Sequence, residues 1–144
     1  MTTYTFYDHI PAQAKYIREE VFVKEQGFHH EFDEIDSRAI HLVIFVEGQA
    51  AGTARMFLEQ EGDTAFTVGR VAVLPQYRGL HLGNQMLALL EEKARELGIQ
   101  RIALSAQCRV QPFYEKNGYI AMGEVYGRIL PPHPYGKGAV TAPG

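Results

Sequence analysis

The sequence predicts an α/β fold built on one sheet of mixed strand direction. Segments rich in β-branched and aromatic residues lie on both sides of one amphipathic helix. The strand–helix–strand crossover over residues 70–106 indicates a parallel pair, and the turn at 47–49 joins a hairpin. Because the chain shows no repeat and no linker, we expect a single domain over residues 1–144.

The N-terminal part predicts a strand followed by a surface helix. Residues 3–7 alternate β-forming residues, and Pro11 suits the first turn of a helix that is expected to end before Gly27. Apolar residues recur at helical spacing, so one side of this helix should be buried. The apolar positions are Ala14, Ile17 and Val21, and the polar positions assigned to the remaining faces are Lys15, Arg18, Glu19 and Lys24.

The middle of the chain predicts an acidic loop and three strands. Residues 28–37 mix histidines, carboxylates and phenylalanines and are interpreted as the loop. The β-branched run at 39–46, the turn at 47–49 and the segment 50–58 predict a β-hairpin. Residues 63–74 predict the next strand.

A second amphipathic helix is predicted after residue 81, with Glu91 on its charged side and Gly98 as its C-terminal stop. Its apolar stripe consists of Leu82, Met86, Leu89, Leu90, Ala94 and Leu97. The remaining predicted segments are a strand at 101–106, a short helix at 112–117 closed by Gly118, a strand at 119–129 and a Pro/Gly-rich tail at 131–144.

Composition narrows the class of protein. A formal net charge of −3 and a pI near 6.1 lack the basic excess typical of nucleic-acid binding, so no nucleic-acid partner is expected. Cys108 is the only cysteine, which rules out an intrachain disulfide and a cysteine-held zinc. No leader pattern and no apolar run of membrane-spanning length are present, so we expect a cytoplasmic protein without a membrane partner.

The segment RVAVLPQYRGLHLG, residues 70–83, is the most informative motif. A strand, a proline turn and a Gly/Arg loop open directly into a helix, where unpaired N–H groups and the positive helix end favour a pyrophosphate. No lysine follows the second glycine and no Gly-x-Gly-x-x-Gly is present, so the P-loop and dinucleotide patterns are not matched. A plain connecting turn remains the alternative.

This motif, followed by PFYEKNGY, resembles the GCN5-related N-acetyltransferase (GNAT) superfamily over roughly residues 40–125. The signature Gln/Arg-x-x-Gly-x-Gly/Ala can be aligned from Gln76 or from Arg78, and both alignments put His81 at a glycine. A negative φ is open to histidine there. Finer features resemble the ElaA-like branch, namely REEVFVKEQ at 18–26, EFDEID at 31–36, AIH at 39–41, SAQ at 105–107 and PPH at 131–133.

The resemblance implies a mostly antiparallel sheet with a splayed strand pair, and acetyl-CoA as co-substrate in a core of about residues 68–118. Backbone amides from Gly79 to Asn84 would hold the CoA pyrophosphate, with charge added by Arg78. Main-chain groups of a strand would pair with the pantetheine arm, and an N–H near Val73 would stabilise the oxyanion. The implied cofactor-binding residues are Val71, Ala72, Val73, Arg78, Gly79, Leu80, His81, Leu82, Gly83, Asn84, Gln107 and Phe113.

The catalytic residues are less constrained by the sequence. Tyr114 stands where the superfamily places a phenol that protonates the departing thiolate, and aromatic packing beside Phe113 is the alternative. Gly69 replaces the glutamate that many members carry, so another general base is implied, and His133 is our candidate on the acceptor side. The open candidates for the base are His29, His30, Glu31, Asp33, Glu34, Asp36, His41 and His133.

The acceptor is expected to be a primary amine of a small molecule or a protein, drawn by the acidic segment through Glu31 and Glu34. No metal is expected. His30 and Glu31 could begin a His-Glu-x-x-His pattern, but Glu34 stands where the second histidine would be needed. Direct attack by the amine is favoured over an acetyl-enzyme at Cys108. A homodimer stays open, and the alternatives to an enzyme are an acetyl-CoA sensor and an interaction module.

Overall fold

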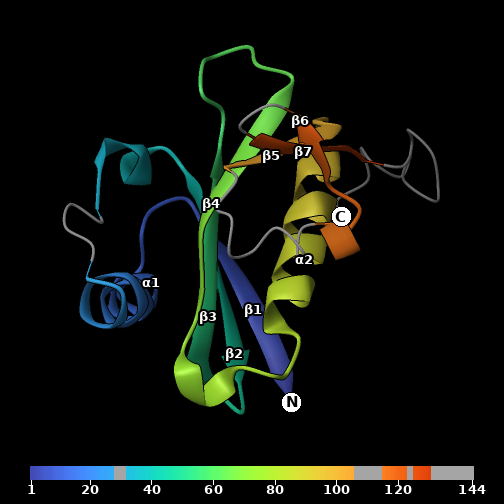
Figure 1. The fold of residues 1–144 in the computed structure, drawn as a ribbon. Coiled ribbons are helices and arrows are strands. Elements are labelled where there is room, and N and C mark those ends of the chain that lie inside the picture. Colours follow the sequence, from blue (N-terminus) through green and yellow to red (C-terminus); the bar gives the residue numbers. More distant parts are fainter. Residues whose placement is uncertain (28–31, 106–114, 123–124, 131–144) are drawn as a thin grey trace. The chain divides into compact units, whose positions relative to one another are not determined.

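The computed structural model describes residues 1–27, 32–105, 115–122 and 125–130 (Figure 1). In these residues the strands pair in the order β1 (Thr2–Tyr7), β2 (Ile40–Val46), β3 (Gln49–Phe57), β4 (Ala65–Val73), β5 (Arg101–Ser105), β7 (Val125–Ile129) and β6 (Ile120–Met122). The β4–β5 pair is parallel, whereas β1–β2, β2–β3, β5–β7 and β6–β7 are antiparallel, which confirms the predicted mixed, mostly antiparallel sheet.

The chain forms two compact units that share a strand and a helix. The first unit is Met1–Phe57 with Gly69–Leu87, and the second is Leu58–Val68 with Ala88–Gly144. The strand β4 (Ala65–Val73) and the helix α2 (Leu82–Glu96) each contribute residues to both units. The single domain expected from the sequence stays a prediction.

The first unit holds an antiparallel set of strands. The β1–β2 register runs from Thr2↔Val46 to Tyr7↔His41, and β2 and β3 form the predicted hairpin with a register shift between Ile44 and Phe45. The Leu74 N–H donates to the Ala51 carbonyl, 2.9 Å away, so the chain leaving β4 stays tied to β3. The strands are β1 (Thr2–Tyr7), β2 (Ile40–Val46), β3 (Gln49–Phe57) and the second half of β4.

The helix α1 (Ala12–Arg18) continues as the π-helical segment η1 (Glu19–Glu25) and covers one face of these strands (Figure 1). Its predicted apolar side is confirmed, since all three of its members are buried. They pack with one residue of β2 and two at the end of β4, and the cluster is Ala14, Ile17, Val21, Val43, Ala72 and Leu74. The assignment of Arg18 to an outer face was wrong, because its side chain is only 1% exposed.

The first turns of α2 lie on the side of the strands that Ile44 faces. A Cβ atom built on Gly52 would lie 3.1 Å from Ile44 Cγ2 and 3.1 Å from Met86 Cε. Neighbouring side chains of a strand point to opposite faces, so Val43 meets α1 while Ile44 meets α2. Helices on both faces explain why the run His41–Ile44 is buried without alternation.

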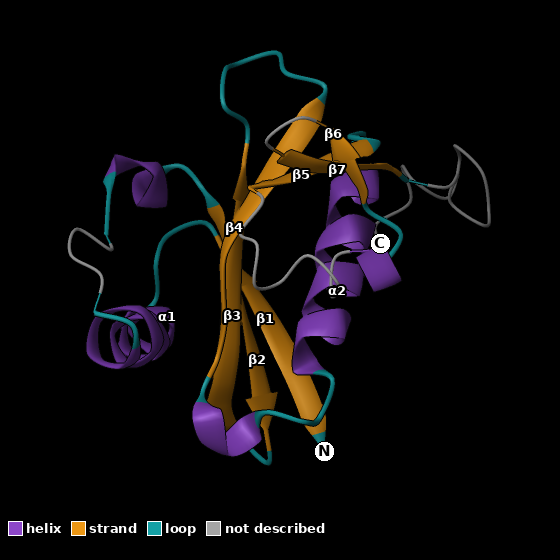
Figure 2. Ribbon diagram, viewed as in Figure 1, coloured by secondary structure: helices purple, strands orange, loops and turns teal. Residues whose placement is uncertain are grey.

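The second unit contains the parallel pair and a C-terminal hairpin. The start of β4 pairs with β5 (Arg101–Ser105), and β5 pairs with β7 (Val125–Ile129). The single strand predicted at 119–129 was wrong, because β6 (Ile120–Met122) pairs with β7 in antiparallel register (Figure 2). Two residues lie between Met122 and Val125 in the sequence. One of them is Gly123, a residue typical of turns, and the prediction of one continuous strand did not take it into account.

A buried carboxylate lies on the part of α2 that belongs to the second unit. Glu91 is 8% exposed and accepts a hydrogen bond from the Tyr119 hydroxyl at 2.7 Å. Arg128 Nη1 donates to both oxygens of Glu91 at 3.1 Å and to the Asn117 carbonyl at 2.9 Å. The assignment of Glu91 to the solvated side of the helix was therefore wrong, because a hydroxyl and a guanidinium satisfy its carboxylate inside the unit.

The apolar stripe of α2 differs from the predicted one at two positions. Leu97 is 51% exposed, whereas Leu87, absent from the predicted stripe, is buried. Leu97 lies beyond the last residue of α2, where the chain is already turning. The predicted stop is confirmed, since Gly98 has φ +82° and its N–H donates to the Arg95 carbonyl at 3.0 Å.

Candidate active site

The strand β4 changes character at its middle. Its register with β5 runs from Ala65↔Arg101 to Val68↔Leu104 and, in the described residues, ends there, while β4 continues to Val73. Arg70 has φ +53°, a left-handed conformation that is rare inside a strand. The described part of β5 ends at Ser105, so the described β4–β5 pairing does not extend to the segment Val71–Val73.

A compact turn follows β4 and leads into α2. The 3-10 turn η3 (Pro75–Tyr77) begins with the Tyr77 N–H donating to the Leu74 carbonyl, and the Arg78 N–H donates to the Pro75 carbonyl at 3.2 Å. The first hydrogen bond of α2 joins the Gln85 N–H to the His81 carbonyl at 3.1 Å. Residues 75–81 form what we call the phosphate loop.

Main-chain donors gather where the phosphate loop meets α2. Among the residues that the structure describes, no hydrogen-bond acceptor is found for the N–H groups of Gly79, His81, Leu82 and Gly83. A 15-residue helix adds the positive end of its dipole at the same place. This arrangement favours an anion with several oxygens, such as a diphosphate.

His81 takes the conformation of the glycine that it replaces in the signature. Its φ is +59°, so His81 does not adopt the negative φ that is open to histidine. The loop geometry fixes this dihedral, and histidine is one of the non-glycine residues that tolerate the left-handed region. Gly79 has φ +88°, and a Cβ added there would meet no atom within 4 Å, so this glycine serves the backbone conformation.

The side chain of Arg78 does not stand free beside these donors. Its Nη1 and Nη2 bind the two carboxylate oxygens of Glu25 at 2.9 and 2.7 Å, and its Nε donates to the Val73 carbonyl at 3.0 Å. The hydrogen bond from Arg78 lowers the pKa of Glu25, and the same contact raises the pKa of Arg78. Sequence reasoning did not pick out Glu25, because one carboxylate at a helix end carries no pattern.

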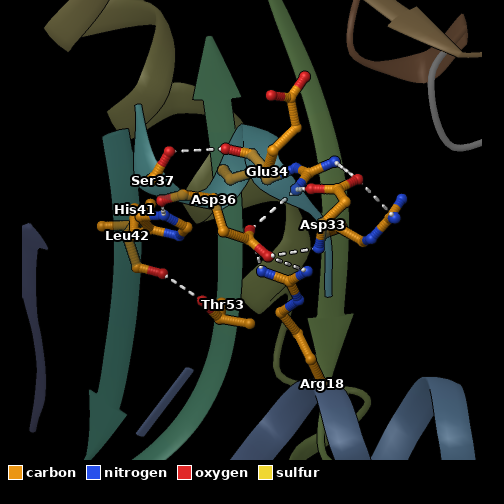
Figure 3. Close-up of polar contacts among 10 residues, drawn as sticks. Arg18, Asp33, Glu34, Asp36, Ser37, His41, Leu42 and Thr53 are labelled. Carbon is orange, nitrogen blue, oxygen red and sulfur yellow. Dashed lines mark hydrogen bonds and ion pairs between the residues drawn. The ribbon is translucent and has the colours of Figure 1, made fainter. Parts of the chain in front are cut away.

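Asp33 and Asp36, two of the candidate bases, lie in a network of arginines (Figure 3). Arg18 binds Asp36 through two contacts of 2.7 and 3.2 Å, and Arg55 Nη1 lies 2.7 Å from Asp33 Oδ1 and 2.8 Å from Asp36 Oδ1. Arg70 Nη2 reaches Asp33 Oδ2 at 3.4 Å. The network thus joins α1, β3, β4 and the turn η2 (Glu34–Ser37).

These contacts hold both aspartates in the ionised state. Burial raises the pKa of Asp36, but the hydrogen bond from Arg18, followed by its charge and by Arg55, outweighs burial and lowers this pKa to about 2. The hydrogen bond from Arg55 likewise lowers the pKa of Asp33. A carboxylate so weakly basic is a poor proton acceptor at neutral pH, so neither aspartate suits the role of general base.

His41 belongs to the same network. It is 1% exposed and its Nε2 lies 2.9 Å from the Asp36 carbonyl, which can only accept, so Nε2 carries the proton. Burial lowers the pKa of His41 and leaves the imidazole neutral. The register explains the position, since His41 lies directly opposite Arg55 and both side chains project to the face covered by α1. A base must reach substrate, so His41 is disfavoured as well.

The strand residue Arg55 carried a signal in the sequence. Arg55 stands between Ala54 and Met56 in a strand that is buried from Ala51 to Phe57. A charged residue at an inward strand position requires a buried partner, which here is the aspartate pair. The alternation of the strand could therefore predict that Arg55 has a buried acidic partner, although it could not identify that partner.

Glu34 lies beside a hollow on the first unit. The hollow has a volume of about 620 Å³ and is lined by His9, Ile10, Lys15, Phe32, Asp33, Glu34, Asp36 and Ser37. Of its three carboxylates, Asp33 and Asp36 are bound to arginines, whereas Glu34 is exposed. Asp33 is exposed as well, but Arg55 and Arg70 compensate its charge, so Glu34 is the lining carboxylate that we consider for binding a cation.

Several predicted site residues fall outside the described part of the chain: His29, His30, Glu31, Gln107, Cys108, Phe113, Tyr114 and His133. Their roles stay predictions. Within the described residues, no group of three or more His, Cys, Asp or Glu side chains is arranged to hold a metal ion. In the same residues no helix has both the length and the apolar character that a bilayer crossing needs.

The mixed sheet with its parallel β4–β5 pair, and the turn that leads from β4 into α2, match the fold of the acyl-CoA N-acyltransferases. The chain belongs to the Acetyltransferase (GNAT) family, whose family model matches residues 4–119. It is 34% identical to the uncharacterized N-acetyltransferase YjcF of Bacillus subtilis (strain 168) over 77% of this chain and 79% of YjcF.

The ElaA-like branch of the family is confirmed by sequence and by structure. The chain is 27% identical to protein ElaA of Escherichia coli (strain K12) over 78% of this chain and 76% of ElaA. The crystal structure of Escherichia coli ElaA superposes with a TM-score of 0.72 at 25% identity, covering 88% of this chain and 97% of ElaA. An acyl-CoA N-acyltransferase from Pseudomonas aeruginosa superposes with a TM-score of 0.77 at 26% identity, covering 88% and 97%.

Proposed function

We propose that this protein transfers the acetyl group of acetyl-CoA to a primary amine. The observation that carries the proposal is the cluster of main-chain N–H groups at the start of α2, those of Gly79, His81, Leu82 and Gly83, for which the described residues supply no acceptor. Together with the Asn84 amide, they would hold the CoA diphosphate. Their number and spacing suit the several oxygens of that group.

The strand β4 would align the rest of the cofactor. Past Val68 its described register with β5 has ended, so the main chain of Val71, Ala72 and Val73 is suited to pair with the pantetheine arm. The Val73 N–H would stabilise the oxyanion that forms on the thioester carbonyl. Leu80, Leu82, Gln107 and Phe113 would line the cofactor site.

The reaction is a direct displacement. The amine nitrogen attacks the acetyl carbon, a C–N bond forms, and the C–S bond breaks when the tetrahedral intermediate collapses. A base takes the proton of the attacking nitrogen, and Tyr114 protonates the CoA thiolate. Asp33, Asp36 and His41 are held by the ionic network and are disfavoured as this base. The remaining candidates for the base are Glu31, Glu34, His29, His30 and His133.

The acceptor amine would be recruited at the hollow beside Glu34. An exposed carboxylate next to Phe32 offers a charge and an aromatic surface to an ammonium group before it loses its proton. Small-molecule and protein amines both fit this chemistry.

Two measurements test the proposed function. Calorimetry with CoA should show binding, and thiol release from acetyl-CoA over a panel of amines should show turnover and reveal the acceptor class. Absence of CoA binding at millimolar concentration would refute the assignment, whereas binding without turnover on any amine would indicate a sensor. Cys108→Ala should keep full turnover, since a loss would point to an acetyl-enzyme, and Tyr114→Phe should lower kcat.

A further inference from the structure

The guanidinium of Arg78 ties three segments of the first unit together. It meets Glu25, the last residue of η1, through a two-pronged ion pair, and it meets Val73, the last residue of β4, through Nε. Its own main-chain N–H closes the turn onto the Pro75 carbonyl. Arg78 thus connects a helix end, a strand end and the turn immediately before Gly79.

The phosphate loop has few other restraints. Tyr77 packs against the cluster under α1, but Pro75, Gln76 and Gly79 are exposed and Leu80 is 49% exposed, so the half of the loop that precedes α2 has little apolar packing. An anion site depends on donors that are already in place, because ordering them on binding would cost affinity. The Arg78 contacts therefore add order next to Gly79, beyond the position that Tyr77 anchors by apolar packing.

We propose that Glu25 and Arg78 act as a positioning pair for the phosphate loop, with Arg78 fixing the main chain and not lending its charge to the diphosphate. This inference rests on the proposed function and deepens it. The Glu25 carboxylate lies opposite the guanidinium fork and compensates its charge at the distance of a bidentate pair. The diphosphate would then be bound by neutral N–H groups and the helix end.

The two possible roles of Arg78, positioning the loop and binding the diphosphate by its charge, predict different changes in CoA affinity for the same variants. If Arg78 positions the loop, Glu25→Gln weakens CoA binding, and Arg78→Lys weakens it too, because an ammonium keeps the charge but loses the fork. If Arg78 instead serves as a charge for the diphosphate, Glu25→Gln liberates that charge and tightens binding, and Arg78→Lys binds as the wild type does.

The experiment is a double-mutant cycle of CoA affinity by calorimetry on the full chain. We expect Glu25→Gln and Arg78→Lys each to raise Kd by about tenfold, and the double variant to be no worse than either single one, as coupled residues behave. Glu20→Gln is the matched control, since Glu20 pairs with Lys24 at 2.6 Å on the same segment η1 and should leave Kd unchanged. Circular dichroism and melting of each variant verify folding.

Each outcome supports or overturns the positioning role. Tighter binding by Glu25→Gln, wild-type binding by Arg78→Lys, or independent effects in the double variant would overturn it. If Glu25→Gln failed to fold, Glu25→Asp would replace it, since a shorter carboxylate keeps the charge and loses the two-pronged contact. A wild-type protein that ignores CoA would refute the proposed function itself.

Discussion

The main chain of Gly52 lies directly against the carbonyl oxygen of Ala72, so that a Cβ on Gly52 would approach this oxygen to 3.1 Å. Ala72 is one of the β4 residues expected to face the pantetheine arm. The close approach therefore links the packing of β3 to the strand that we propose aligns the cofactor.

Gly52→Ala should disturb both stability and cofactor binding. The added methyl group also meets Ile44 and Met86 at 3.1 Å, so we expect the free energy of unfolding to fall by about 1–3 kcal/mol, as overpacked cores do. Urea denaturation and CoA calorimetry measure the two effects. Gly69→Ala is the control, because a Cβ at Gly69 meets nothing within 4 Å; equal losses in both variants would contradict the steric argument.

Two substitutions of His81 should change the stability of the protein in opposite directions. His81→Gly removes a side chain held at φ +59° and should raise stability by up to about 1 kcal/mol, while His81→Val, a β-branched residue that resists this dihedral, should lower it. The Val variant should also weaken CoA binding, because the loop N–H groups would diverge. Thermal melting with and without CoA is the measurement, and a stabilised Val variant would refute the dihedral argument.

Arg18→Met should be strongly destabilising. It leaves the buried Asp36 carboxylate with one arginine fewer, and breaking a buried pair costs about 3–5 kcal/mol. Because Arg55 still contacts Asp36, the low end of that range is expected. Urea denaturation checks this, with Lys15→Met on the exposed side of α1 as a control that should change little.

Stability should decline in two stages as pH falls. The folded pKa of His41 and of Asp36 lies below the unfolded value, so the unfolded chain binds more protons on acidification. His41 lowers the free energy of unfolding as the pH falls below its reference pKa of 6.5. Asp36 lowers it further as the pH falls from its reference pKa of 3.8 to its folded pKa of about 2. Urea midpoints at about pH 7.5, 5 and 3 should fall successively, and His41→Gln should flatten the first interval. An unchanged first interval in that variant would exclude His41 as its cause.

Local patterns predicted most of the fold. The helical spacing of Ala14, Ile17 and Val21 and the turn at 47–49 report on interactions within one segment, and the structure confirms both. The resemblance implied the splay of β4 from β5. No local pattern could predict it, because it depends on where two strands that are distant in the sequence stop pairing.

The errors fell on residues whose partners are distant in the chain. Arg18 and Asp36 are 18 residues apart, and Glu91 and Tyr119 are 28 apart, so a helical pattern assigned both helix residues to solvent. The same reason left eight candidate bases open at first, since only the positions of Arg18 and Arg55 show which carboxylates are neutralised. For His81, the loop geometry decided the dihedral and the residue type only had to tolerate it.

The single carboxylate of Glu91 holds the end of β7 through Arg128, and it holds the segment before β6 through Tyr119 and through the Asn117 carbonyl that Arg128 also binds. These segments should consequently open together and not one by one. Hydrogen exchange would show amides around Tyr119 and Arg128 with one shared protection energy, and Glu91→Gln would lower that protection in both segments at once.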